Sequence, residues 1–152
     1  MKRLVAAAVL LALGAGACAS EQGGTPEPEG PAPAVAPVTL EGKVDNRGVK
    51  DLTSSGANVA FEMESDDNSF DPTFVKVTPG ATVKVEVIQT GQAPHTFTID
   101  SPAVSPPVDV VTNKKGEKKT AELTLPTDGV VTFYCRFHKD LGMQGAFYFR
   151  EG

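Results

Sequence analysis

Hydrophobic and polar residues alternate with a period of two from Asn58 onward. The clearest segments are 58–64, 83–87 and 96–100, where Val, Phe, Met or Ile occupies every second position. Segments 131–135 and 147–149 continue the pattern to the end of the chain. Successive side chains of a strand point to opposite faces of a sheet, so this alternation predicts half-buried β-strands. No segment shows a convincing helical period.

Turn signals separate these segments. Pro79-Gly80 fits a type II turn, and further signals stand in the proline cluster at 102–107, at Lys115-Gly116 and at Asp128-Gly129. Seven or eight short strands within about 110 residues predict an all-β fold, namely one antiparallel β-sandwich with a single core.

The segment 38–57 fits two interpretations. Val38, Leu40 and Val44 alternate as an edge strand would. Glycine at 48 and the SerSerGly run at 54–56 favour a loop instead. The sequence leaves both interpretations open.

The first seventeen residues have the three parts of a secretory signal. A basic start at Met1–Arg3 precedes an apolar run at 4–13 and a small-residue cleavage site at Ala15–Ala17. The apolar run is too short to span a bilayer. We therefore expect export, to the periplasmic or extracellular side.

Cys18 directly follows the expected cleavage point, an arrangement that resembles the lipobox of bacterial lipoproteins. The resemblance implies that Cys18 becomes a lipid-modified N-terminus, and two acyl chains or more would hold the protein stably on a membrane. The alternative is ordinary cleavage that leaves Cys18 as a free thiol. We expect the lipid anchor to be the only contact with the membrane.

Residues 18–37 combine this cysteine with a linker. The stretch 19–37 holds five prolines, three glycines, three glutamates and no aromatic residue, so it cannot build a core. The expected organisation is a signal peptide at 1–17, an anchor cysteine and linker at 18–37, and one domain at 38–152.

Net charge limits the partners. The whole chain carries a formal charge of −5, and removal of the two basic residues of the signal makes the rest more acidic still. Nucleic acid is therefore not an expected partner. We interpret the acidic residues of the first strands as a solvated face and loop, although a docking patch for a basic cytochrome is the alternative: Glu62, Glu64, Asp66, Asp67 and Asp71.

Both histidines of the chain and the one cysteine of the predicted domain fall into a metal-ligand pattern. Cys135, His138 and Met143 lie within nine residues, and His95 lies about forty residues upstream. A thiolate, two imidazoles and a weak axial thioether are the ligands of a blue-copper site. Each residue alone is ordinary, because a lone cysteine commonly acts as a small buried hydrophobe. Structural zinc fits less well, because it favours four Cys or His ligands.

These residues resemble the cupredoxins, and the Cys-x2-His-x4-Met loop is similar to that of plastocyanin. The resemblance extends from Asn58 to the C-terminus and includes the AlaProHis run at 93–95, the PheAspPro step at 70–72 and the turn at Pro79-Gly80. It implies a Greek-key topology with one type 1 copper ion at one end of the sandwich. The family usually has Asn after the first histidine ligand, where it ties two ligand loops together, and this chain has Thr96.

The spacing also says where each ligand should lie. His95 is expected at the start of one strand, Cys135 at the end of another and Met143 before the last strand, so that all three loops meet at one end. We expect Gly142 and Gly145 to provide the backbone freedom that a tight ligand loop needs.

The function that follows is single-electron transfer between redox partners such as a cytochrome, an oxidase or a reductase. We expect these partners to dock near His138, at a small patch formed by Pro94, Leu141 and Gly142. A copper carrier or storage protein with the same ligands is the alternative. An enzyme is not expected, because a copper oxidase or nitrite reductase needs a further histidine-rich centre, and the chain has two histidines in total.

Overall fold

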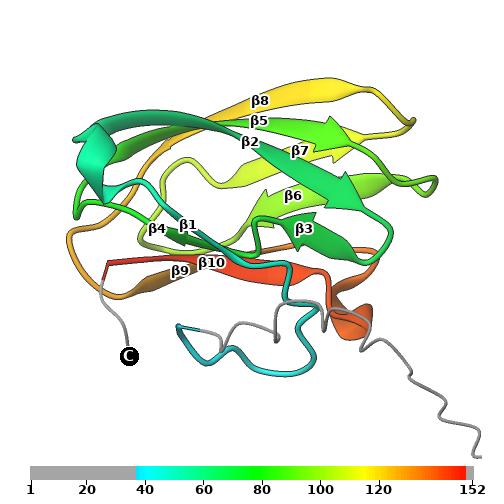
Figure 1. Cartoon of the computed structure of the whole chain (residues 1–152), viewed down its shortest axis with the longest axis horizontal. Coiled ribbons are helices and arrows are strands. Elements are labelled where there is room, and N and C mark those ends of the chain that lie inside the picture. Colours follow the sequence, from blue (N-terminus) through cyan, green and yellow to red (C-terminus); the bar gives the residue numbers. More distant parts are fainter. Residues whose placement is uncertain (1–36, 150–152) are drawn as a thin grey trace, which may run out of the picture. The chain divides into compact units, whose positions relative to one another are not determined.

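The computed structural model describes residues 37–149, and these form two β-sheets packed face to face (Figure 1). The larger sheet has, in order across it, β1 (Val49–Asp51), β4 (Phe74–Lys76), β10 (Gln144–Tyr148), β9 (Val130–Tyr134), β6 (His95–Ile99) and β7 (Val108–Thr112). The smaller sheet has β3 (Ser69–Asp71), β2 (Asn58–Asp66), β5 (Thr82–Gln89) and β8 (Lys118–Thr124). The predicted all-β sandwich is confirmed.

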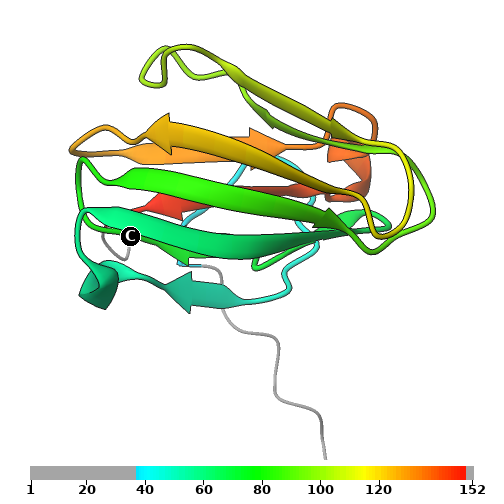
Figure 2. The ribbon, with the colours of Figure 1, turned by 90° about the horizontal axis from the view of Figure 1, so that it is seen from above.

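The period-two alternation produces the smaller sheet directly. Every second residue of β2 is buried, including Phe61 and Met63, while the residues between them are exposed. Strand β5 runs parallel to β2, as Figure 2 shows from above, and presents Val83, Val85 and Val87 to the same core. Burial of this apolar surface between the sheets is the main favourable contribution to folding. Phenylalanine rings fill the space between the sheets: Phe61, Phe70, Phe97, Phe133 and Phe147.

Two details of the predicted sandwich are wrong. The sheets are mixed, because β2 pairs with β5, and β4 with both β1 and β10, in parallel. The described residues also contain ten strands, not the predicted seven or eight. Three of them, β1, β3 and β4, have only three residues each. Such short strands carry too few alternating positions to be recognised from periodicity.

The larger sheet departs from simple alternation where the site is built. All five residues of β6 and all five of β10 are buried. Strand β6 lies between β9 and β7, and β10 lies between β4 and β9, so both are interior strands of the sheet. The threonines of β6 that alternate with Phe97 and Ile99 are therefore enclosed and need internal hydrogen-bond partners.

The sequence left the segment 38–57 ambiguous between an edge strand and a loop. Its residues 49–51 form β1, at the edge of the larger sheet, whereas the segment 38–48 contains no strand. It lies against the larger sheet, where Val38 joins a small cluster with Phe74, Ala146 and Tyr148, and Leu40 and Val44 pack beside it. The loop interpretation is therefore right for residues 38–48, whereas an edge strand does form further along the segment, at 49–51. The predicted signal peptide and Cys18 lie outside the described residues. Within residues 37–149, no helix is long and apolar enough to cross a membrane.

Strand directions bring the ligand loops together. Strand β9 is antiparallel to both β6 and β10. The start of β6, the end of β9 and the start of β10 therefore lie at the same end of the larger sheet. His95, Cys135 and Met143 occupy or adjoin those three positions.

Candidate metal centre

Three potential metal donors converge at this end of the sandwich. The Nδ1 atoms of His95 and His138 are 3.2 Å apart. The sulfur of Cys135 lies 3.5 Å from Nδ1 of His138 and 4.0 Å from Nδ1 of His95. Within the described residues, these three form the one group of histidine, cysteine and acidic side chains close enough to hold a metal ion.

The spacing of the donors suits a single first-row transition metal ion. Metal–nitrogen bonds of about 2.0–2.1 Å and metal–sulfur bonds of about 2.3 Å, as zinc makes, place three evenly spread donors roughly 3.5–3.8 Å apart. The observed separations of 3.2, 3.5 and 4.0 Å bracket this range. Two imidazoles with one thiolate favour copper among such ions. The cluster is thus compatible with a single type 1 copper site.

The sulfur of Cys135 is enclosed and accepts a backbone hydrogen bond. Cys135 is fully buried, and the backbone N–H of Thr96 lies 3.4 Å from its sulfur. An N–H donor stabilises the thiolate form, which is the form that binds a metal. The strand that begins at His95 therefore supplies both a candidate ligand and a donor to the sulfur.

A tight turn carries the remaining residues of the loop. The backbone N–H of His138 donates to the carbonyl of Cys135 at 3.2 Å, and that of Met143 donates to the carbonyl of His138 at 3.1 Å. A single 3₁₀ turn, η2 (Lys139–Leu141), lies between them. Met143 is fully buried and belongs to the same core cluster as Cys135. Its role as an axial ligand stays a prediction.

The two glycines of the loop have different reasons to be glycine. Gly142 has a φ of 111°, which side chains rarely adopt, as predicted for a residue that provides backbone freedom. The same expectation was wrong for Gly145, which has no positive φ. A Cβ there would overlap the Thr73 carbonyl and the Phe133 ring. Gly145 therefore permits close packing.

Thr96 connects the two ligand loops. Its hydroxyl accepts a hydrogen bond of 2.9 Å from the backbone N–H of Arg136, the residue after Cys135. The Thr96 hydroxyl also lies 2.9 Å from that of Thr98, which lies 2.8 Å from a carboxylate oxygen of Asp109. A carboxylate only accepts, so Thr98 donates to Asp109 and accepts from Thr96.

The guanidinium of Arg136 closes this network into a ring. Its Nε and Nη2 donate to the two carboxylate oxygens of Asp109 at 3.1 and 2.8 Å. Such a bidentate pair fixes orientation as well as distance. Thr96, Thr98, Asp109 and Arg136 thus form a closed hydrogen-bonded ring, and threonine performs here the connecting role that the family usually assigns to asparagine.

His95 is fully buried, and its environment keeps the imidazole neutral. Burial lowers the pKa of His95, the proximity of His138 lowers it further, and Asp67 opposes both effects. A neutral imidazole is the form that binds a metal. The contact between Nε2 of His95 and Oδ1 of Asp67, at 3.6 Å, is therefore that of a neutral ring with a carboxylate, not an ion pair.

Asp67 joins two loops near this histidine. Its Oδ1 accepts hydrogen bonds from the backbone N–H groups of Gln92 at 2.9 Å and Ala93 at 3.2 Å. These donors, Ala93 foremost, hold the pKa of Asp67 below its usual value. The approach is so close that a Cβ at Gly91 would lie 2.5 Å from Oδ1 of Asp67. Glycine is therefore required at 91 for steric reasons.

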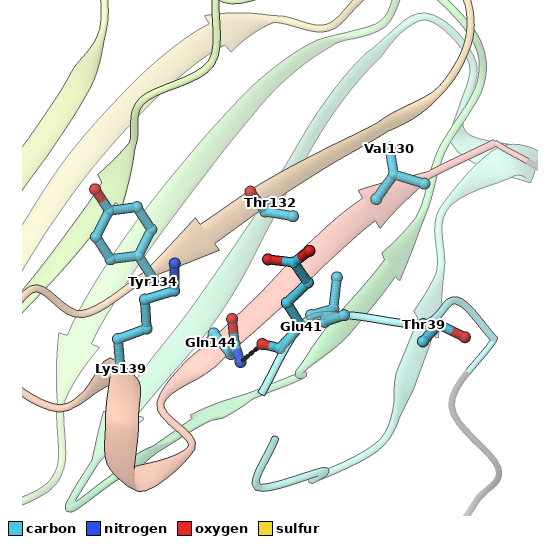
Figure 3. Close-up of a pocket in the computed structure, with 8 residues that line it drawn as sticks. Thr39, Glu41, Val130, Thr132, Tyr134, Lys139 and Gln144 are labelled. Carbon is cyan, nitrogen blue, oxygen red and sulfur yellow. Dashed lines mark hydrogen bonds between the residues drawn. The ribbon is translucent and has the colours of Figure 1, made fainter. Parts of the chain in front are cut away.

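The segment that precedes β1 supports the ligand loop from the other side. The side-chain amide of Gln144 donates to the carbonyl of Glu41 at 2.8 Å (Figure 3) and to that of Lys43 at 2.6 Å. The backbone N–H of Asp45 donates to the carbonyl of Gly142 at 2.9 Å. We call residues 38–46 the N-terminal strap. A pocket of about 290 Å³ lies beside it, lined in part by Thr132, Tyr134, Lys139 and Gln144.

Exposure differs sharply between the two histidines. His95 is buried, whereas His138 is partly accessible. Two large apolar side chains of the same loop are exposed, Phe137 by 56% and Leu141 by 50%. Pro94 is also exposed, but Gly142 is buried. The predicted patch of Pro94, Leu141 and Gly142 was therefore wrong in Gly142. The exposed apolar residues of these two loops are Pro94, Phe137 and Leu141.

Some supporting residues were not recognised from the sequence. Asp67 was interpreted as part of a solvated acidic face, although its carboxylate turns toward His95. Asp109 and Gln144 carried no signal, because their partners Arg136 and Glu41 are distant in sequence. Thr98 was not recognised either. One local feature did point to the region, namely Thr96, which stands where the family usually has asparagine.

Comparison with known proteins supports the fold. A family model described as a cupredoxin-like domain matches residues 47–147. No curated protein sequence matches the chain. Auracyanin B is similar with a TM-score of 0.50 and 15% identity, over 61% of this chain and 88% of that one.

Two further solved structures are similar. A heme-copper terminal oxidase dimer has a TM-score of 0.51 and 18% identity, over 74% of this chain and 76% of that one. Auracyanin A, a "blue" copper protein from the green thermophilic photosynthetic bacterium Chloroflexus aurantiacus, has a TM-score of 0.49 and 18% identity, over 61% of this chain and 99% of that one. At these identities, the scores of 0.50 and 0.51 show a shared fold.

Proposed function

This chain belongs to the cupredoxin-like domain family, and from that premise we propose that it is a mononuclear blue copper protein that transfers single electrons between redox partners. One observation carries the proposal, namely the convergence of Cys135, His95 and His138 with donor atoms 3.2–4.0 Å apart. Bound copper would supply the one-electron Cu(II)/Cu(I) couple. The protein supplies a site that changes little when the electron arrives.

Each residue of the proposed copper site has its own role. Cys135, His95 and His138 would hold the copper ion, and Met143 would supply a fourth, weaker ligand. The N–H of Thr96 stabilises the thiolate, and the hydrogen-bonded ring keeps the two ligand loops at a fixed separation. Because the fold itself makes these contacts, little reorganisation should accompany a change of oxidation state. Low reorganisation favours electron transfer over copper delivery.

The electron enters and leaves through His138. His138 is the more accessible histidine, and Phe137 and Leu141 offer exposed apolar surface beside it. Transient redox contacts are small, below about 1,200 Å² in total, so a patch of this kind is sufficient. A cytochrome, an oxidase or a reductase would press against it without a large desolvation cost.

We place the protein outside the cytoplasm, attached to the outer side of a membrane through a lipidated Cys18. The support is the signal-like sequence at 1–17 and the position of the cysteine directly after it. The chain by itself is not an enzyme, because both of its histidines already belong to the one cluster.

Addition of Cu(II) to the apo-protein tests the proposal. A direct bond from the Cys135 thiolate should give an intense visible charge-transfer band and a type 1 EPR signal. Cys135→Ser is the matched control and should lose the colour. A Cys135→Ser protein as blue as the wild type would contradict the assignment. Repeated reduction and oxidation should leave copper bound, whereas release of copper at each cycle would favour the carrier or storage function.

A further inference from the structure

We propose that Asp67 is a positioning residue that orients the buried His95 ring and, through its charge, lowers the reduction potential of the copper centre. The inference rests on the proposed function, because it requires that His95 binds copper. No sequence motif connects Asp67 or its neighbours at 66–68 with the site.

The two ring nitrogens of His95 have different roles: Nδ1 faces the metal donors, and Nε2 faces Asp67. Its Nδ1 faces the other two donors, 3.2 Å from His138 and 4.0 Å from the sulfur of Cys135. When Nδ1 binds a metal, the ring proton must be on Nε2. Nε2 is buried and has no hydrogen-bond partner among the described residues. Oδ1 of Asp67 lies 3.6 Å from it.

The distance decides how this contact acts. At 3.6 Å it is longer than an ordinary hydrogen bond, so the charge of the carboxylate provides the interaction. An anion facing the N–H side of a ligating imidazole favours the Nε2–H tautomer and makes Nδ1 a stronger donor. Cu(II) carries one more positive charge than Cu(I), so it gains more from both effects. The carboxylate therefore favours the oxidised state.

The fold fixes the carboxylate in place even though the side chain is 49% exposed. Its Oδ1 is held by the N–H groups of Gln92 and Ala93. Asn68, in the left-handed region with φ of 68°, forms the turn that follows, and Gly91 allows the two loops to approach. Solvent weakens the field of a half-exposed charge, so the effect should decrease as ionic strength rises.

The substitution Asp67→Asn removes the charge of the side chain but keeps its position. Asparagine retains an oxygen that accepts from Gln92 and Ala93 but carries no charge. Asp66→Asn is the matched control, because it removes the same charge one residue earlier, from a carboxylate that accepts a hydrogen bond from the Asp67 N–H. Both full-length variants are loaded with copper, and their midpoint potentials are measured by spectroelectrochemistry at low and high salt.

We expect Asp67→Asn to remain blue and to raise the potential by more than Asp66→Asn does. The dissociation constant of Cu(II) should rise more than that of Cu(I), and each tenfold change in their ratio corresponds to about 59 mV for one electron. Equal shifts in the two variants, or an unchanged potential in Asp67→Asn, would overturn the proposal. If the wild type itself does not become blue with Cu(II), the proposed function fails instead.

The apo-protein gives a second measurement that needs no copper. ¹⁵N NMR of the histidine rings should show His95 mainly as the Nε2–H tautomer in the wild type and in Asp66→Asn. Asp67→Asn should raise the share of the Nδ1–H tautomer. If Asp67→Asn does not take up copper, the NMR measurement alone tests the proposal. An unchanged tautomer ratio in that variant would overturn it.

Discussion

The hydroxyl of Thr96 accepts a hydrogen bond of 2.9 Å from the backbone N–H of Arg136. Thr96 follows one proposed ligand and Arg136 follows another, so this bond joins the loops that carry His95 and Cys135. The bond is partly buried, although Arg136 itself is an exposed residue. The ring through Thr98 and Asp109 makes the bond part of a cooperative network.

Thr96→Val should weaken this connection. Valine has nearly the shape of threonine but no hydroxyl, and the N–H of Arg136 would lose its partner. We expect a loss of about 1–3 kcal/mol in the free energy of unfolding of the apo-protein, measured by urea denaturation, with a broader Cu(II) EPR spectrum. Thr96→Ser keeps the hydroxyl and should retain most of the stability. Equal losses in both variants would mean that packing, not the hydrogen bond, matters.

Met143→Gln should lower the reduction potential while copper stays bound. The amide oxygen is a harder ligand than the thioether and favours Cu(II), and the axial ligand contributes little to affinity. The control is Met63→Leu, at another buried methionine of the core, which should leave the potential unchanged. Complete loss of copper from Met143→Gln would show that Met143 anchors the ion.

Gln144→Leu should release the N-terminal strap from the ligand loop. Leucine has a similar volume but donates to neither Glu41 nor Lys43. The loss of two hydrogen bonds should cost about 1–3 kcal/mol of unfolding free energy and increase hydrogen exchange at the Asp45 N–H, which bonds to Gly142. Thr132→Ala, in the lining of the same pocket, is the control. Unchanged exchange at Asp45 would show that the strap holds without Gln144.

Leu141→Glu should slow electron exchange with a redox partner while the copper spectrum and potential stay nearly the same. The side chain is 50% exposed beside His138, so a charge there must be desolvated when a partner docks. Val130→Glu is the matched control, because Val130 is 46% exposed at the opposite end of the strand that leads to Cys135. If both variants exchange electrons at the wild-type rate, the electron enters by another face.

Cys18→Ala should move the protein from the membrane fraction to the soluble fraction of the exported compartment, because lipid attachment is its expected membrane contact. Ser20→Ala, two residues further on, should fractionate as the wild type does. Immunoblots of separated fractions measure both. Membrane retention of Cys18→Ala would remove the lipoprotein proposal and leave the copper site unaffected.

Local spacing determined the central part of the site. Cys135, His138 and Met143 lie within one short loop, where the residue types and their separations alone indicate copper chemistry. The alternation of Val59, Phe61 and Met63 likewise determined a half-buried strand, because a strand's side chains alternate whatever it pairs with. These features depend on neighbours in sequence, which a single sequence displays.

Only the tertiary structure decided which residues support the site. Asp67 reaches Ala93 across 26 residues, Arg136 reaches Thr96 across 40, and Gln144 reaches Glu41 across 103. Such contacts follow from which strands pair and in which direction, and parallel pairing of β2 with β5 leaves no local mark in either strand. Periodicity specifies which face of a strand is buried. It does not specify which distant loop that strand end will meet, so an acidic residue that looked solvated lies against a buried histidine.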